Sequence, residues 1–430
     1  MHAVEPARPP ARTVVVLGLL STFGPLSLDL YLPALPQLAD DLGASASLAQ
    51  LSITACLVGL AVGQLVAGPL SDRLGRRRPL IVGLVAFLLA SVACALAPSA
   101  AVLVLLRLVQ GLAGAAGIVI SRAIARDLYS GRALMIFFSR LLLVAGLAPV
   151  IAPVLGGQLT RIMTWRGIFG VLAGFGAVLL LAGLFGLKET LPPERRIVGS
   201  FRRTLQGYNT LLHDRFFVGC ALSSGLAGAS MFAYIAGSTF VLQRIYGMSP
   251  QGFSLVFGCI SLGLVAAAQG GARLALVWPL PRVLGFGLTI NFLGATALLI
   301  TVISGLPLGA LIGALVIMVC AVGLIFPTAN ALAMADYPDL AGTASSLQGL
   351  SQFVFGAVAA PLVGIAGEQT ALPLGIVATS ASLCAMMLCQ PRAACRTVPR
   401  SESMTLKALA NFLRIAPEKK LPVRFHAQSP

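Results

Sequence analysis

The sequence predicts an all-α membrane protein with twelve transmembrane helices in two six-helix bundles, and three observations support this prediction. Of the 430 residues, 57% are hydrophobic and only 10% are charged, whereas a soluble domain carries about 25% charged residues. The apolar runs are roughly 20 residues long, which is the length that a helix needs to cross a bilayer. A polar segment over 188–215 separates six apolar runs from six others.

Charged and turn-forming residues divide the apolar sequence into the predicted spans. The first span begins near Thr13, and no small-residue cleavage site follows it, so we expect a retained helix and not a signal peptide. The spans form an N-terminal bundle over 13–187, a cytoplasmic linker over 188–215 and a C-terminal bundle over 216–390, flanked by segment 1–12 and a basic tail over 391–430. The predicted spans are 13–35, 48–70, 79–97, 100–122, 134–158, 166–187, 216–240, 252–272, 283–304, 306–330, 342–367 and 372–390.

The basic residues predict how the chain is oriented. Of the 30 Lys and Arg residues, only Arg161, Arg166 and Arg244 lie on loops that follow odd-numbered spans. Cytoplasmic loops carry an excess of Lys and Arg, so we expect both termini and the linker in the cytoplasm. Because the basic residues sit between apolar runs, the net charge of +16 is interpreted as a topology signal and not as a nucleic-acid-binding surface.

The stretch 68–79, GPLSDRLGRRRP, places five charged residues in seven positions between spans 2 and 3. A topology anchor alone needs the arginines but neither Asp72 nor Gly75. Asp72 can accept hydrogen bonds from a helix N-terminus or from an arginine, and Gly75 permits a tight turn. The stretch is therefore predicted to make specific contacts at the cytoplasmic face.

Asp29 is the one carboxylate well inside a predicted span, in LDLYLPALP near the outer end of span 1. An ionisable group inside a bilayer costs at least ~2.5–3.5 kcal/mol and is a functional candidate. A lone carboxylate can bind and release a proton as its surroundings change. The alternative is a residue in the outer headgroup region, ahead of Pro33 and Pro36.

Arg107 lies in span 4, in LLRLVQGLAGAAG, and shares one helix face with Gln110, Gly111 and Gly114. Counted along their helices, Arg107 and Asp29 lie at similar depth, ~10 Å inside the outer end. If spans 1 and 4 face each other, the two side chains are expected to form a charge pair. The alternative is an arginine that reaches the interface on its long stem.

Span 5 carries a stripe of small and kinking residues in GLAPVIAPVLGG. The stripe predicts a bent helix that packs closely against a moving partner. General packing of small residues explains the glycines but not two prolines on one stripe. The residues of the stripe are Gly146, Pro149, Pro153, Gly156 and Gly157.

The second half of the chain contains no acidic residue well inside a predicted span. Its segment MFAYIAGSTFVL offers Phe232 and Tyr234 as an apolar, aromatic surface for a substrate, although core packing explains each of them equally well. Together with two residues of the first half, Tyr31 and Gln110, they are the candidate cavity residues.

These motifs resemble the major facilitator superfamily. GPLSDRLGRRR is similar to the superfamily signature of cytoplasmic loop 2–3, RLVQGLAGA to the span-4 motif of its proton antiporters, and APVIAPVLGG to the span-5 antiporter motif, with Ala152 in place of the usual glycine. Together with LDLYLPALP and MFAYIAGSTFVLQRIYGMSPQGFSLVFG, they resemble the bicyclomycin-resistance (Bcr/CflA) branch of drug:proton antiporters. The resemblance covers about residues 13–388.

The resemblance implies two bundles around a central cavity that alternates between the two sides of the membrane. It implies that Asp29 is the proton-coupled carboxylate, Arg107 its partner, and the span-5 stripe a seal between the bundles. It also implies a latch on the cytoplasmic gate, although Ala272 and Arg273 replace the aspartate and arginine pair in the second half. The latch residues are Gly68, Asp72, Arg73, Gly75, Arg76 and Arg77.

We therefore expect a proton-driven exporter of amphipathic drugs in a bacterial inner membrane, as a monomer in the lipid bilayer. It would use the proton gradient and no cofactor or metal, and the sequence lacks the clustered His, Asp or Glu that an enzyme needs. The alternative is a solute-specific major facilitator, either an exporter of a sugar, amino acid or dipeptide, or an importer. The sparse polar residues of the second half argue against a small polar substrate.

Overall fold

The computed structural model describes residues 11–129, 131–196, 200–337, 340–365 and 370–393. The predicted tail over 391–430 and segment 1–12 fall almost entirely outside these residues. Within them the regular elements are helices. We refer to the end of the molecule that carries the 188–215 segment as the linker end and to the opposite end as the far end.

Every predicted span coincides with a helical segment. Nine helices in the described part are long and apolar enough to cross a membrane, ten if one bent pair counts as a span, and two shorter apolar helices match spans 5 and 12. The elements of the first half are α1 Ala11–Ser21, α2 Phe23–Asp29, η1 Leu32–Ala34, α3 Leu35–Asp41, α4 Ala46–Leu74, α5 Arg77–Ala95, α6 Ala100–Leu128, α7 Gly131–Leu159 and α8 Trp165–Gly186.

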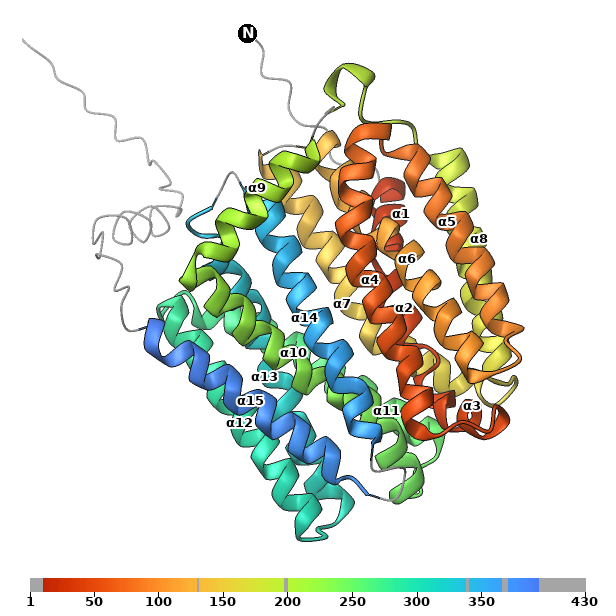
Figure 1. Cartoon of the computed structure of the whole chain (residues 1–430), viewed down its shortest axis with the longest axis vertical. Helices are drawn as coiled ribbons and strands as arrows, with labels where there is room; N and C mark the ends of the chain where they lie inside the picture. The colour runs from red at the N-terminus through yellow and green to blue at the C-terminus, as the bar shows by residue number, and fades with distance from the viewer. Residues whose placement is uncertain (1–10, 130, 197–199, 338–339, 366–369, 394–430) are drawn as a thin grey trace, which may run out of the picture. The chain divides into compact units, whose positions relative to one another are not determined.

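The linker and the second half continue in the same way (Figure 1). Short helices η2 (Pro193–Arg195) and α9 (Ser200–His213) lead from α8 into the second half. Its elements are α10 Arg215–Phe240, the π-helical turn η3 Val241–Ile245, α11 Pro250–Leu274, α12 Leu280–Ile303, α13 Leu308–Met334, α14 Ala341–Gly364 and α15 Leu372–Ala393.

The first span differs from the continuous helix predicted over 13–35. It breaks at Thr22 with a bend of 46° and then passes through the 3₁₀ turn η1. Pro25 lacks the N–H that would bond to the Ser21 carbonyl. The hydroxyl of Ser21 also donates to the Gly18 carbonyl at 2.6 Å, a local bond of a kind that often bends helices. Because of this break, α2 is a separate short helix, and Asp29 is its last residue.

Side-chain caps fix the far ends of several long helices. The hydroxyl of Ser45 accepts the Leu48 N–H at the start of α4, Ser99 caps α6, and Ser249 caps α11. Such caps satisfy backbone donors that have no partner inside the helix.

The two halves meet along two pairs of helices. In Figure 1, α14 of the second half lies beside α4 of the first, and α11 packs against α7 in the same way. At the far end of the α4–α14 contact, a Cβ on Gly364 would lie 2.7 Å from the Cα of Ser47, so the two backbones touch there. Between these two contacts the halves enclose a cavity.

Candidate functional site

The cavity between the halves has a volume of about 390 Å³ and is lined by helices of both. This volume suits a drug-sized molecule. Most of the wall is apolar. Its aromatic residues come mainly from the second half and include Phe232, Tyr234, Phe257, Phe326 and Phe353.

Asp29 places a carboxyl group at this cavity. It is 6% exposed, and α2 presents it to the space that Phe232 and Tyr234 also line. Among the described residues that line the cavity, Asp29 is the only acidic one. A carboxyl group between an apolar wall and an accessible space can exchange a proton as that space fills or empties. The predicted position of Asp29 inside span 1 thus brings it to the centre of the molecule.

Arg107 is fully buried inside the first half. One guanidinium nitrogen donates to the Ser27 carbonyl at 2.7 Å, and another donates to the Gln110 side chain. The guanidinium carbon lies 4.6 Å from the centre of the Tyr31 ring, within the range of a cation–π interaction. Arg107 therefore joins α6 to the backbone of α2 two residues before Asp29.

The expected charge pair between Asp29 and Arg107 is not formed in this structure. The ion pairs within the described residues involve neither side chain. Spans 1 and 4 do face each other, as the pairing required, but Arg107 points at the α2 backbone while Asp29 points into the cavity. Residue spacing in the sequence predicts how deep a side chain lies along its helix. It does not predict where a side chain points when the helix is broken, as it is before Asp29.

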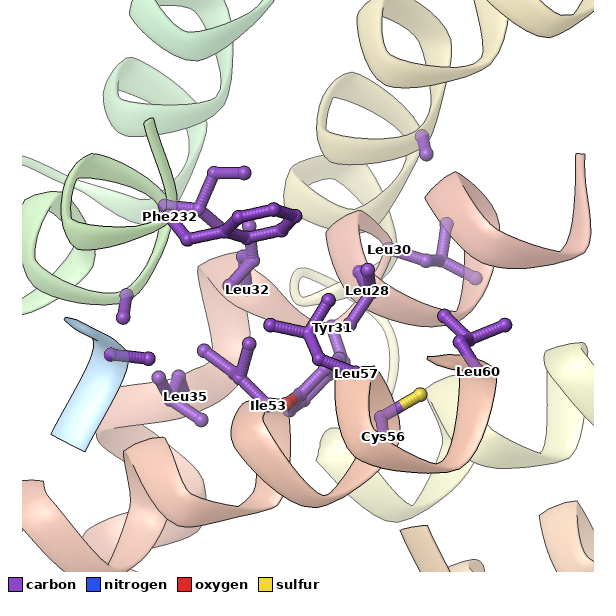
Figure 2. Packing of buried hydrophobic residues seen from close by; sticks show 14 of the residues in the cluster. Leu28, Leu30, Tyr31, Leu32, Leu35, Ile53, Cys56, Leu57, Leu60 and Phe232 are labelled. Carbon is purple, nitrogen blue, oxygen red and sulfur yellow. The ribbon is translucent and has the colours of Figure 1, made fainter. Parts of the chain in front are cut away.

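Two of the four candidate cavity residues lie elsewhere, so their predicted placement was wrong. Tyr31 is fully buried beside α4, where its hydroxyl lies 3.0 Å from that of Ser52 and its ring is surrounded by apolar side chains such as Leu57 (Figure 2). The side-chain oxygen of Gln110 accepts a hydrogen bond from Arg107, and its amide nitrogen donates to the hydroxyl of Ser91 at 2.7 Å. Phe232 and Tyr234 do line the cavity.

The far end of the cavity is closed by contacts between the halves. Gln50 donates to the Ala236 carbonyl at 3.2 Å, just beyond the last α10 residue that lines the cavity. Further out, Gln243 donates to the Pro33 carbonyl at 3.2 Å, and Arg244 forms an ion pair with Asp40. The cavity lies on the linker side of these contacts.

The opposite end of the cavity reaches toward the linker end. The lining there includes Arg122 near the end of α6, Asn330 near the end of α13 and Ser345 at the start of α14. The structure therefore has one end closed by bonds between the halves, while the cavity extends toward the other.

The stripe predicted on span 5 lies on α7, where its first residues line the cavity and its last two glycines contact neighbouring segments. Gly146 and Pro149 line the cavity, and Pro153 is buried further along the helix. The prolines remove backbone donors from the middle of α7. This part of the stripe forms the wall of the cavity itself.

The last two glycines of the stripe are contact points. A Cβ on Gly156 would lie 2.0 Å from the Leu30 carbonyl oxygen, directly after Asp29 in the chain. A Cβ on Gly157 would lie 2.2 Å from the hydroxyl of Ser254 in α11. Only glycine permits this approach, so α7 touches both the Asp29 segment and the second half at the far end.

The charged loop after α4 forms a network inside the first half. Arg76 forms ion pairs with Asp72 and, at 2.8 Å, with Asp127 at the end of α6. Its guanidinium also donates to the hydroxyl of Ser71 at 2.9 Å. Arg76 thus binds the ends of α4 and α6 together at the linker end.

A second carboxylate, Glu189, holds the same turn from the segment after α8. Gly75 ends α4 with φ of +88°, and its Cβ position would fall 2.5 Å from a Glu189 carboxylate oxygen. Glu189 accepts the backbone N–H groups of Arg76 at 2.8 Å and Arg77 at 3.2 Å. Partial burial raises the pKa of Glu189, but backbone N–H donors, including Leu191, outweigh it and lower the pKa below its usual value.

The remaining latch residues make simpler contacts. Arg77 donates to the Leu184 carbonyl at 2.7 Å, Arg73 is exposed in the last turn of α4, and Gly68 has ordinary packing space around it. The predicted role of this loop as a latch between the halves concerns another conformation and stays a prediction.

Sequence reasoning missed Asp127, Glu189 and Arg122. Asp127 and Glu189 lie outside the predicted spans, where acidic residues are unremarkable, and their partner Arg76 is 51 and 113 residues away. Arg122 was assigned to the end of a span, but α6 continues to Leu128. The helical pattern of the sequence continues after Arg122 without a turn-forming residue, and this continuation could have indicated that the helix extends beyond it.

Comparisons with known proteins give one consistent family. A family model described as Major Facilitator Superfamily matches residues 17–392. The chain is 43% identical to an MFS-type transporter of Bacillus subtilis (strain 168), YdgK, over 84% of this chain and 90% of the relative. It is 30% identical to a chloramphenicol resistance protein of Pseudomonas aeruginosa, over 85% and 86% of the two chains.

A further relative is a bicyclomycin resistance protein homolog of Haemophilus influenzae, 29% identical over 84% of this chain and 91% of that protein. Among solved structures, a nucleoside transporter, NupG, superimposes with a TM-score of 0.71 at 13% identity, covering 88% of this chain and 99% of that chain. A D-xylose-proton symporter gives a TM-score of 0.63 at 15% identity, over 87% and 95%. At such identities the two structures establish the fold alone.

Proposed function

Because this chain belongs to the Major Facilitator Superfamily, we propose that it is a proton-coupled antiporter that exports amphipathic small molecules, including antibiotics. It would work in a bacterial inner membrane as a monomer, with both termini in the cytoplasm. On that orientation the linker end faces the cytoplasm, and the cavity described here is the state that receives substrate from inside the cell.

The observation that carries this proposal is Asp29 in the wall of a cavity between two halves that touch at one end. A transporter of this type works by rocking one half against the other around a fixed central site. A carboxyl group in that site meets each side of the membrane in turn. If substrate and proton compete for the site, release of one accompanies binding of the other.

The nature of the cavity supports an amphipathic substrate. Most of its wall is apolar and includes Phe232, Phe257, Phe326 and Phe353, while polar side chains such as Asp29 and Gln352 are interspersed among them. A sugar or a peptide needs several hydrogen-bonding partners in its site. The names of relatives point the same way, since they refer to resistance to bicyclomycin, chloramphenicol and multiple drugs.

The other conspicuous residues receive supporting roles. Arg107 holds the α2 backbone at Ser27 and so positions Asp29. The glycines of α7 seal the far end against leak while it is closed. Asp72 and the arginines around it are proposed to latch the linker end when the halves rock the other way.

The proposal is tested in an efflux-deficient bacterial host exposed to a panel of antibiotics. Wild-type protein is expected to raise resistance to some of them, and Asp29→Asn to abolish that resistance while the protein still reaches the membrane. Glu194→Gln is the matched control because Glu194 is an exposed carboxylate of the linker, outside the spans. Full resistance with well-expressed Asp29→Asn would remove the proposed role of this residue.

A further inference from the structure

We propose that Arg122 makes the cavity selective for substrates that carry an anionic or zwitterionic group, and that such a group binds facing Arg122. The proposal rests on the proposed function, since it defines the substrate class of the same cavity. The structure provides three observations for it, which concern the placement, the bonding and the surroundings of this side chain.

Arg122 occupies the face of α6 that opens onto the cavity. Ile118, one helical turn earlier, also lines the cavity, and residues four apart share a helix face. Fifteen residues before Arg122, α2 covers α6 at Arg107. Neighbouring helices cover most of α6 beyond that crossing, but Arg122 itself is exposed.

Arg122 makes no hydrogen bond or ion pair with any residue that the structure describes. By contrast, Arg107 and Arg76 are buried, and each is bonded to several groups. An ionisable residue of a membrane-spanning helix that faces a cavity is a functional candidate. The guanidinium of Arg122 is therefore available to a ligand.

Arg122 is the only basic residue among the described residues that line the cavity, and Asp29 is the only acidic one. The two are far apart. Arg107 is level with the segment of Asp29, and fifteen further residues of α6 correspond to ~22 Å along the helix axis. This separation is more than twice the screening length of about 8 Å at physiological salt, and solvent reaches Arg122. Asp29 therefore does not neutralise Arg122.

A planar guanidinium at the mouth of an apolar cavity binds carboxylate and similar groups in a bidentate, charge-assisted manner. The low-dielectric wall strengthens this attraction and disfavours a simple organic cation at the same position. A zwitterion can satisfy both ends of the cavity, with its positive group toward Asp29.

The competing explanation is that Arg122 is only part of the topology signal. Arg126 follows one turn later in α6, is exposed and does not line the cavity. It supplies the same positive charge to the same end of the helix. A topology role therefore predicts equal effects at the two positions, whereas a binding role predicts an effect at Arg122 alone.

The test measures binding to the purified full-length protein in lipid nanodiscs, without any gradient. The probes are dansylglycine, which carries a carboxylate, and dansylglycinamide, which is its neutral analogue. Wild-type protein is expected to bind dansylglycine more tightly. Arg122→Gln should raise the Kd for dansylglycine about tenfold, equivalent to about 1.4 kcal/mol, and leave dansylglycinamide within about twofold. Arg122→Lys should retain most of the preference, and Arg126→Gln all of it.

Unchanged binding of dansylglycinamide also shows that the Arg122→Gln cavity is intact. The proposal is overturned if wild-type protein does not prefer dansylglycine, if Arg122→Gln weakens both probes equally, or if Arg126→Gln has the same effect as Arg122→Gln. Because no transport is measured, these outcomes are independent of proton coupling. Loss of the proposed function would appear instead as uphill export by Asp29→Asn.

Discussion

Replacing Gly157 by alanine should open the far end of the molecule. The added Cβ would lie 2.2 Å from the hydroxyl and 2.7 Å from the Cβ of Ser254, and 3.1 Å from the Pro250 carbonyl oxygen. The hydroxyl of Ser254 can rotate away from the added Cβ. The Cβ of Ser254 and the Pro250 carbonyl can move away only if the whole helix α11 shifts. We therefore expect α7 and α11 to separate by about 1 Å at this level, a strain of the kind that costs ~1–3 kcal/mol.

This strain exists only while the halves touch at the far end, so it shifts the equilibrium toward the state in which they are apart. At about 1.4 kcal/mol per factor of ten, the shift amounts to roughly 5- to 150-fold. Gly146→Ala is the matched control on the same helix because its Cβ would have only a contact of 3.9 Å with Val265.

The assay is electron–electron distance measurement between spin labels on Ala44→Cys and Ser304→Cys, with the native cysteines replaced by alanine. These positions lie in far-end loops of the first and second half, respectively. Gly157→Ala should add a population of longer distances that Gly146→Ala lacks. Identical distance distributions for the two variants would refute the argument that close approach at Gly157 depends on far-end closure.

Three further substitutions test other contacts. Arg107→Ala should destabilise the purified protein by about 1–3 kcal/mol, because the buried Ser27 carbonyl loses its donor. A Tm equal to that of the wild type would show that the contact is dispensable. Glu189→Gln should lower Tm at pH 7, and this difference should shrink only as the pH falls below the unfolded pKa of about 4.3 and through the lower native pKa of Glu189. A pH-independent difference would contradict this linkage. Gly75→Ala should cost ~1–3 kcal/mol because of its positive φ, and an unchanged Tm would count against the tight turn.

Much of the fold followed from the sequence because the bilayer imposes simple rules. Apolar runs of roughly 20 residues have one stable arrangement in lipid, and the helices coincide with them. Asp29 stood out for the same reason, since a single carboxylate within a greasy span is conspicuous. The stripe from Gly146 to Gly157 was visible because its spacing is local.

What the sequence did not reveal depends on contacts between distant segments. The break at Thr22 turns Asp29 away from Arg107, and no spacing rule gives that direction. Tyr31 was a candidate cavity residue, but contacts with Ser52 and Arg107 hold it inside the first half. Glu189 reaches the loop after α4 across 113 residues, which is a relation that a single sequence cannot show.

The central claim is that Asp29 carries the proton that is exchanged for the exported molecule. The most direct measurement uses proteoliposomes without a pH gradient, preloaded with an antibiotic to which the protein confers resistance and containing a pH-sensitive dye. Flow of the antibiotic through the wild-type protein, and through Glu194→Gln, is predicted to drive protons in the opposite direction. Asp29→Asn should abolish this proton flow. Proton movement that persists unchanged in Asp29→Asn would contradict the account.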